Sequence, residues 1–217
     1  MGLLDKRTGE KVHSRTLEIF TYPMEDRGII VTGELIEKRL QPYYGISGEI
    51  REPHTVHHMI IRMLIEGLTF TISEIEVEMP GVPREACLET AQSLNRLVGM
   101  NIVSGFTLKA REIVGGRNGC AHLLALLMAM APAAVQGFWV HHTSKPLVIE
   151  KSAHLMEQYL IDTCWVWRRE GPLAQSLLKD YAQLSRVKAD TVHKMFAKWI
   201  DRPDLRLVYP RTLKSLR

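Results

Sequence analysis

The sequence predicts an α+β fold, in which an antiparallel sheet packs against helices and a helical C-terminal extension follows. Apolar and polar residues alternate in much of the N-terminal half, which is typical of half-buried strands. In the C-terminal half, apolar residues recur three and four positions apart, which is typical of helices. We therefore expect an α+β core domain over residues 13–142 and a helical region over residues 146–217.

Four strands are expected in the first half of the chain, over residues 15–22, 28–37, 56–66 and 68–79. Turn residues, including Pro23 and Gly28, separate the first two, and Gly67 separates the last two. The alternation of the fourth strand is interrupted near Ser73, and residues 41–53 are expected to form a loop. Strands joined in this way make an antiparallel sheet.

Helices are expected in the remainder. Residues 84–98 carry apolar side chains at helical spacing, with Pro83 before them and Gly99 after them. Residues 102–112 alternate and predict a further strand, and Cys120 is expected to start a long apolar helix that Pro132 bends or ends. Three more helical stretches are predicted over residues 148–168, 172–183 and 189–200.

The composition favours a reducing compartment. The three cysteines are odd in number and far apart, and the first residues are charged rather than apolar, unlike a secretory signal. We expect a cytoplasmic protein with free thiols. Residues 119–140 contain no charged residue and are long enough to span a bilayer. Pro132, Gln136 and Gly137 interrupt them, so a buried core helix is favoured and no membrane is expected.

Positive charge is concentrated in the C-terminal region. Residues 151–217 hold 13 Lys and Arg against 7 Asp and Glu, within a net charge of +4 for the whole chain. No helix-turn-helix, zinc finger or aromatic RNA-binding pattern accompanies them, so nucleic acid is not expected to bind. A solvated basic face is the favoured interpretation, and an acidic protein partner is the alternative.

Two cysteines lie at predicted helix starts. Cys87 follows Pro83, and Cys120 follows a glycine-rich connection and precedes His122 by two positions. Helix N-termini favour thiolate over thiol, and a thiolate beside a histidine suits zinc or iron. Cys87 also lies on the apolar face of its helix, so packing in the core is an equal alternative for it.

Other candidate residues carry alternatives of their own. His57 and His58 point to opposite faces of a strand, so only one of them can join a given site. His54 begins the same strand and is either a ligand or a solvated histidine. Cys164 lies beside Trp165 and is expected to be shielded.

The favoured function is metal binding without catalysis, with zinc or an iron–sulfur cluster as cofactor and a scaffold or accessory role. Cys87, Cys120 and His122 are the expected core ligands, and His54 or His57 completes the set. Carboxylates able to replace one of them are Glu76, Glu78 and Glu85. One alternative is an enzyme with Cys120 as nucleophile, and another is an interaction module that docks through its basic helical tail.

Several motifs resemble those of a bacterial family of unknown function that is marked by a Gly-Cys-Thr-His-Leu sequence. The resemblance rests on Val56-His57-His58-Met59 and on Gly119-Cys120-Ala121-His122-Leu123, in which Ala121 replaces the threonine. It covers most of the chain and implies no activity.

A more distant likeness is to iron–sulfur scaffold proteins of the NifU and SufU type. It implies that His54 stands at their first ligand, Cys87 at the second and Cys120 at the last. Their Cys-Gly-Asp sequence is absent here.

Overall fold

The computed structural model of the protein describes residues 2–24, 28–143, 155, 157 and 159–184. The chain divides into two compact units, Met1–Pro146 and Leu147–Arg217, and each is described by itself. The helix predicted over residues 189–200 and most of the basic side chains near the C-terminal end lie outside the described residues.

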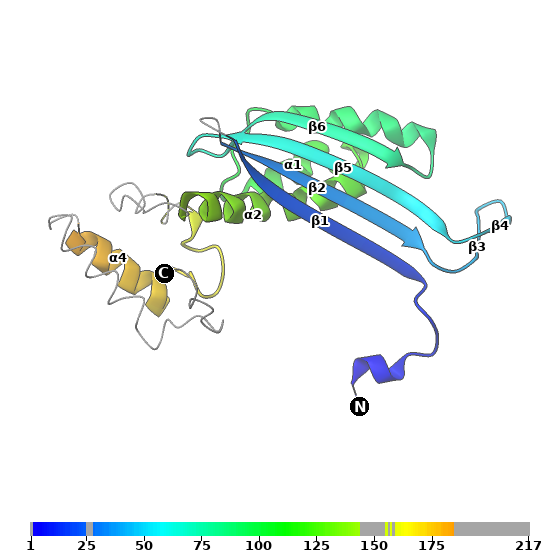
Figure 1. Ribbon diagram of the computed structural model, residues 1–217, viewed down its shortest axis with the longest axis horizontal. Helices are drawn as coiled ribbons and strands as arrows, with labels where there is room; N and C mark the ends of the chain where they lie inside the picture. Colours follow the sequence, from blue (N-terminus) through cyan, green and yellow to red (C-terminus); the bar gives the residue numbers. More distant parts are fainter. Residues whose placement is uncertain (1, 25–27, 144–154, 156, 158, 185–217) are drawn as a thin grey trace, which may run out of the picture. The chain divides into compact units, whose positions relative to one another are not determined.

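A four-stranded antiparallel sheet forms the centre of the first unit, in the order β1-β2-β5-β6 (Figure 1). Its strands are β1 (His13–Met24), β2 (Gly28–Arg39), β5 (His54–Glu66) and β6 (Thr71–Gly81). Each of the four predicted strands overlaps one of these, and the predicted α+β class is confirmed. The expected loop over residues 41–53 carries two short paired strands, β3 (Tyr43–Tyr44) and β4 (Ile50–Arg51).

The irregularity expected near Ser73 is present. Leu64 pairs with Glu74 and Ile65 pairs with Ile72, so Ser73 is an extra residue in β6. An inserted residue of this kind bends the strand and increases its twist.

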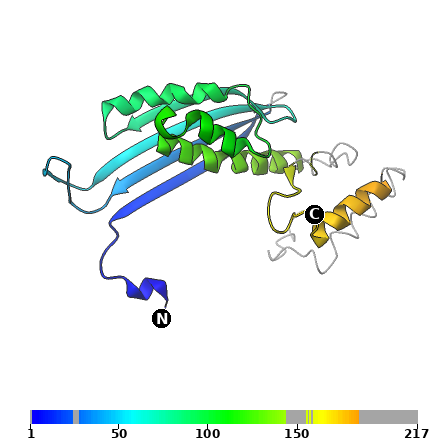
Figure 2. The same ribbon diagram turned by 180° about the vertical axis from the view of Figure 1, so that it is seen from behind.

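The two faces of the sheet differ in what covers them. The helices between residues 85 and 143 lie on one face of the sheet (Figure 2), which we call the covered face. Leu35 of β2 and Met59 and Ile61 of β5 are fully buried there. Their neighbours in the strands point to the other side, the open face, because side chains alternate along a strand. Arg62 lies on the open face and pairs with Glu78 of β6.

The helix expected over residues 84–98 is present as a 3₁₀ helix, η2 (Glu85–Leu97), rather than an α-helix. Its buried residues, Leu94 and Leu97, are three positions apart, and the half-buried Ala91 lies three positions before Leu94. A 3₁₀ helix has three residues per turn, so this spacing forms one continuous stripe.

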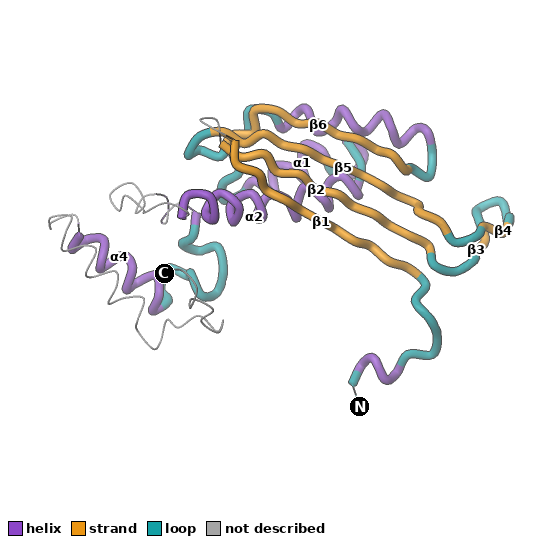
Figure 3. Tube along the Cα trace, in the orientation of Figure 1, coloured by secondary structure: helices purple, strands orange, loops and turns teal. Residues whose placement is uncertain are grey.

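The prediction of a strand over residues 102–112 is wrong. This region forms helix α1 (Phe106–Val114), drawn as helix in Figure 3. Phe106, Ala110 and Val114 are buried at intervals of four, which is a helical period that the local alternation concealed. Gly105 precedes the helix with φ of 84°, a conformation that glycine adopts without strain.

After the short turn η3 (Gly116–Asn118), the long apolar helix α2 (Ala121–Thr143) packs against the covered face. It continues through Pro132, so the proline does not end it. Gly137 lies directly against the side chain of Thr21 in β1, where a larger residue would collide. Residues 121–141 are long and apolar enough to cross a membrane by length and composition alone, a test that core helices also pass.

In the second unit, the predicted helix over residues 172–183 is confirmed as α4 (Pro172–Leu184). Residues 160–167 form turns and bends, so the helix expected over residues 148–168 does not continue through them. Most of the first half of that expected helix lies outside the described residues. Cys164 is exposed and Trp165 is 78% exposed, so the expectation that Cys164 is shielded is wrong.

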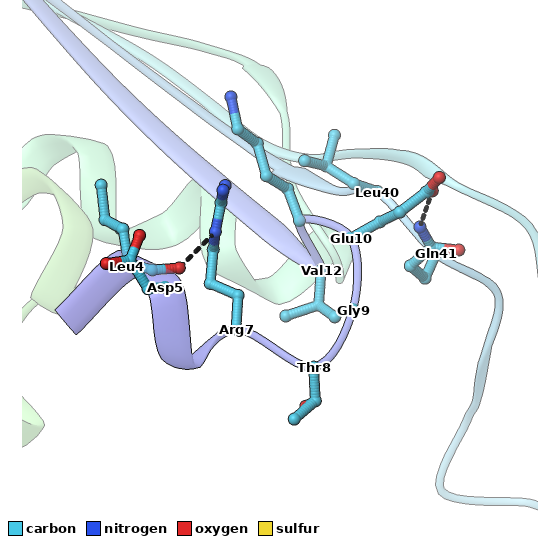
Figure 4. Close-up of a pocket in the computed structure, with 10 residues that line it drawn as sticks. Leu4, Asp5, Arg7, Thr8, Gly9, Glu10, Val12, Leu40 and Gln41 are labelled. Atoms are coloured by element: carbon cyan, nitrogen blue, oxygen red, sulfur yellow. Dashed lines mark hydrogen bonds between the residues drawn. The ribbon is translucent and has the colours of Figure 1, made fainter. Parts of the chain in front are cut away.

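The N-terminal segment begins with a short 3₁₀ helix, η1 (Leu3–Lys6), and joins the sheet through a hydrogen bond from the Leu40 amide to the Val12 carbonyl oxygen. A shallow hollow of about 1000 Å³ lies between this segment and the end of β2 (Figure 4). Gln41 donates to Glu10 across it. None of the residues that line it is a candidate ligand from the sequence.

Candidate metal centre

A carboxylate lies on the covered face of the sheet, where apolar side chains are expected. In β2, Val31, Gly33, Leu35 and Glu37 occupy successive positions on this face. Glu37 is 8% exposed and is the one buried charged residue among those that the structure describes. An ionised carboxylate at such a depth requires hydrogen-bonding or ionic partners.

The neighbouring strands supply three of those partners. Arg15 of β1 and His57 of β5 stand directly opposite Glu37 in the register of the sheet. Nη2 and Nε of Arg15 donate to Oε1 of Glu37 at 2.7 and 3.2 Å. Nε2 of His13 lies 2.8 Å from the same oxygen, and Nδ1 of His57 lies 2.6 Å from Oε2.

Helix α2 supplies the fourth partner from its first turn. Nε2 of His122 lies 3.1 Å from Oε2 of Glu37. The His122 ring stacks on that of His57, with centroids 3.6 Å apart and planes inclined by 24°. One ligand atom from each of Glu37, His57 and His122 lies within 4.8 Å of the other two. We call these three residues the His-Glu cluster.

The electrostatics of the site favour an ionised Glu37 and a neutral His122 at neutral pH. Burial acts to raise the pKa of Glu37, but hydrogen bonds from Arg15, His13 and His57 outweigh it, and the pKa falls from 4.5 to about 2. Burial lowers the pKa of His122 below 6.5, and the neighbouring His57 adds to that shift. An ionised carboxylate and a neutral imidazole are the forms that coordinate metal ions.

Cys120 adjoins the cluster from the other side of His122. Its carbonyl oxygen accepts the first hydrogen bond of α2, from the Leu124 amide at 3.0 Å, so it caps the helix as expected. Its Sγ lies 3.7 Å from Nδ1 of His122, the ring nitrogen that faces away from Glu37. The thiol therefore contacts the cluster through the histidine.

The other two candidate ligands lie elsewhere. Cys87 is half-buried in the first turn of η2, with Thr90 donating to its carbonyl oxygen. His54 is exposed, with Nδ1 2.7 Å from the carbonyl oxygen of Glu52 and its ring beside Tyr43. Neither belongs to the His-Glu cluster, which is the one group of three or more candidate ligands found among the described residues.

Sequence reasoning missed the carboxylate at the centre of the site. It considered Glu76, Glu78 and Glu85, of which the first two lie beside Arg62 on the open face. Glu37 had a detectable signal, because it follows Leu35 by two residues and continues the buried phase of its strand. Two histidines and a carboxylate that converge at a helix start are a known zinc ligand set.

The fold and the cluster define an α+β protein with a carboxylate–histidine site beneath a helix N-terminus. The chain belongs to the family described as Protein of unknown function (DUF2889), whose sequence pattern matches residues 13–136. That range contains every residue of the site described above. No curated protein matches the chain, and no solved structure does.

Proposed function

We propose that the protein binds one divalent metal ion, zinc, through Glu37, His57 and His122. The observation that carries the proposal is the convergence of their three ligand atoms within 4.8 Å. The three residues come from two strands and one helix that are far apart in the sequence. Their proximity is therefore a result of the fold, whereas residues adjacent in the sequence would be close in any fold. A bound ion would add to the ion pairs that already offset the burial of Glu37.

The ligand types favour zinc over an iron–sulfur cluster. Zinc accepts imidazole nitrogens and carboxylate oxygens, and sites with three protein ligands leave one position for water or substrate. Iron–sulfur clusters are held mainly by thiolates, and Cys120 is the one cysteine that adjoins the cluster among the described residues. Ferrous iron is the other ion suited to two histidines and one carboxylate. The likeness to iron–sulfur scaffold proteins stays a separate prediction.

Residues around the His-Glu cluster hold its side chains in an orientation suited to metal binding. Arg15 donates twice to Oε1 of Glu37, which leaves Oε2 facing the two imidazoles. Cys120 contacts the outer nitrogen of His122 and so favours one orientation of the ring. Partners of this kind, which touch ligands rather than the ion, raise metal affinity by fixing geometry. His13 is close enough to Oε1 to join as a fourth ligand after a side-chain rotation.

One observation favours a second function, a cysteine-dependent enzyme. Cys120 is half-buried at a helix N-terminus and lies 3.7 Å from a histidine nitrogen. This arrangement resembles a nucleophile beside its base. In that case Cys120 reacts with small electrophiles ahead of the exposed Cys164, and Cys120→Ser removes that fast reaction. Under the zinc proposal, Cys120→Ser weakens metal binding and leaves the ion bound by the cluster.

Isothermal titration with zinc tests the proposal directly. Protein stripped with a chelator should take up close to one zinc per chain, and His57→Asn or His122→Asn should weaken binding by roughly tenfold to a hundredfold or more. His58→Asn is the matched control, because His58 is the next residue, faces the open side and pairs with Glu34 at 2.6 Å. The absence of zinc uptake by folded wild type, or equal losses in the His57 and His58 variants, would refute the proposal.

A further inference from the structure

The strand β1 is an edge of the sheet with nothing paired to its outer side among the described residues (Figure 1). It is 12 residues long and pairs with β2 from His13 opposite Arg39 to Met24 opposite Gly28, without a bulge. An edge strand presents unpaired N–H and C=O groups that another strand can bind. A long and regular edge is therefore a binding surface.

The opposite edge of the sheet is partly closed by the chain itself. At the start of β6, the Ile72 amide donates to the Met100 carbonyl oxygen at 2.9 Å, and the Gly99 amide donates to the Ile72 carbonyl oxygen at 2.8 Å. Thr71 and Asn101 form an antiparallel bridge in the same place. Among the described residues, the fold thus covers the beginning of one edge and pairs nothing with the outer side of β1.

From Ile19 to Tyr22 the side chains of β1 lack the usual protection against strand pairing. Soluble proteins blunt exposed edges with lysine, proline or bulges. β1 contains no lysine, its proline is the second-last residue, and its arginine is bound to Glu37. Three of its apolar side chains are instead exposed, Leu17 at 37%, Phe20 at 54% and Tyr22 at 51%.

We propose that β1 pairs antiparallel with β1 of a second copy of this chain, so that two four-stranded sheets form one continuous sheet. A two-fold axis between the two strands lets the outward N–H groups of each copy donate to the outward C=O groups of the other, about ten hydrogen bonds for a strand of this length. Phe20 and Tyr22 of both copies then lie on the same open face.

The charge pattern selects the register of this pairing. Opposite residues must share a face, so the axis passes through a residue of β1 rather than between two residues. An axis through Glu18 would place two carboxylates against each other, which is unfavourable. An axis through Ile19 or Phe20 avoids this contact and brings the exposed apolar side chains of the two copies together.

The pairing is independent of the proposed zinc site. His13 and Arg15 reach the covered face with their side chains, whereas the pairing uses the outward backbone of the same strand. Loss of zinc binding in His57→Asn should therefore leave the association intact, and the two proposals can fail separately.

Sedimentation and light scattering of the full chain over a wide range of concentration test the proposal. Wild type should be a dimer, and Phe20→Glu should weaken the association by roughly tenfold or more. With the axis through Phe20 the two new carboxylates face each other, and with the axis through Ile19 each faces Glu18 of the other copy, so both registers bring like charges together. Tyr22→Glu is the second variant, to be used if circular dichroism shows that Phe20→Glu does not fold. Ile46→Glu is the control, since Ile46 is 92% exposed in the turn between β3 and β4.

The expected result is a dimer that both β1 variants disrupt and the control retains. Wild type that stays monomeric at every concentration would overturn the proposal. A dimer or larger assembly that survives both β1 variants would also overturn it, because association then uses a different surface.

Discussion

Replacing Glu37 with glutamine should destabilise the protein in a pH-dependent way. Glutamine keeps the size of the side chain but removes the charge that binds Arg15, His13 and His57. The prediction applies to metal-free protein, kept so with a chelator, so that the carboxylate interacts with these side chains alone. It tests whether the ionised carboxylate holds β1, β2 and β5 together at the site.

The expected magnitude follows from the lowered pKa. The pKa of Glu37 falls from 4.5 to about 2, and one pKa unit corresponds to 1.36 kcal/mol, so the ionised side chain contributes about 3 kcal/mol. Because the pKa is lower in the folded state, this contribution is complete above pH 4.5 and is lost as the pH falls toward 2. The difference between wild type and Glu37→Gln should therefore shrink over that interval.

Urea unfolding followed by circular dichroism at pH 6 and near pH 2.5 measures both quantities. At pH 6 the free energy of unfolding of Glu37→Gln should be about 3 kcal/mol lower than that of wild type. Glu78→Gln is the control, because Glu78 pairs with Arg62 on the open face with 53% of its side chain exposed, and such pairs contribute about 0 to 1 kcal/mol. A Glu37→Gln deficit below about 1 kcal/mol at pH 6, or one that is equal at both pH values, would contradict the pKa argument.

Two further measurements test the thiols and the packing of α2. A small alkylating reagent should label the exposed Cys164 before Cys87 and Cys120, which are half-buried, and mass spectrometry of timed samples gives the order; labelling of Cys120 first would mean that its helix-cap position outweighs its burial. Gly137→Leu should lower the free energy of unfolding by about 1 to 3 kcal/mol because its side chain collides with Thr21. Gln136→Leu, at an exposed position of the same helix, should cost far less, and equal effects would show that the close approach at Gly137 is unimportant.

The strands were predictable because alternation is a local signal. In β5, Met59, Ile61 and Met63 occupy every second position, and that pattern alone fixes both the strand and the face it buries. The region of α1 shows the limit of the method. In nine residues, Phe106, Ala110 and Val114 are compatible with a period of two as well as of four, and only contact with η2 and α2 distinguishes them.

The site was predictable only in part, because its members meet through long-range pairing. His57 was a candidate because it lies in a predicted strand, and His122 because it follows Cys120 at a predicted helix start. The register of β5 and the start of α2 bring the two rings together. Glu37 and His13 come into the same place through the pairing of β1 with β2. Nothing in the local sequence reports this register, since it depends on how three strands align.

The position of Glu37 itself argues for a function beyond stability. A charged group bound in the interior is weak evidence for stabilisation, because apolar residues of similar size often serve as well or better. Leucine at position 37 would continue the apolar row of Leu35 and would leave Arg15 and His13, both more than a third exposed, free to turn to water. A fold that needed only packing there would be expected to carry an apolar residue. The carboxylate has two imidazoles within 3.1 Å of one oxygen and an arginine on the other. Packing alone does not call for this set, whereas the metal binding proposed above would account for the convergence of the carboxylate and the two imidazoles.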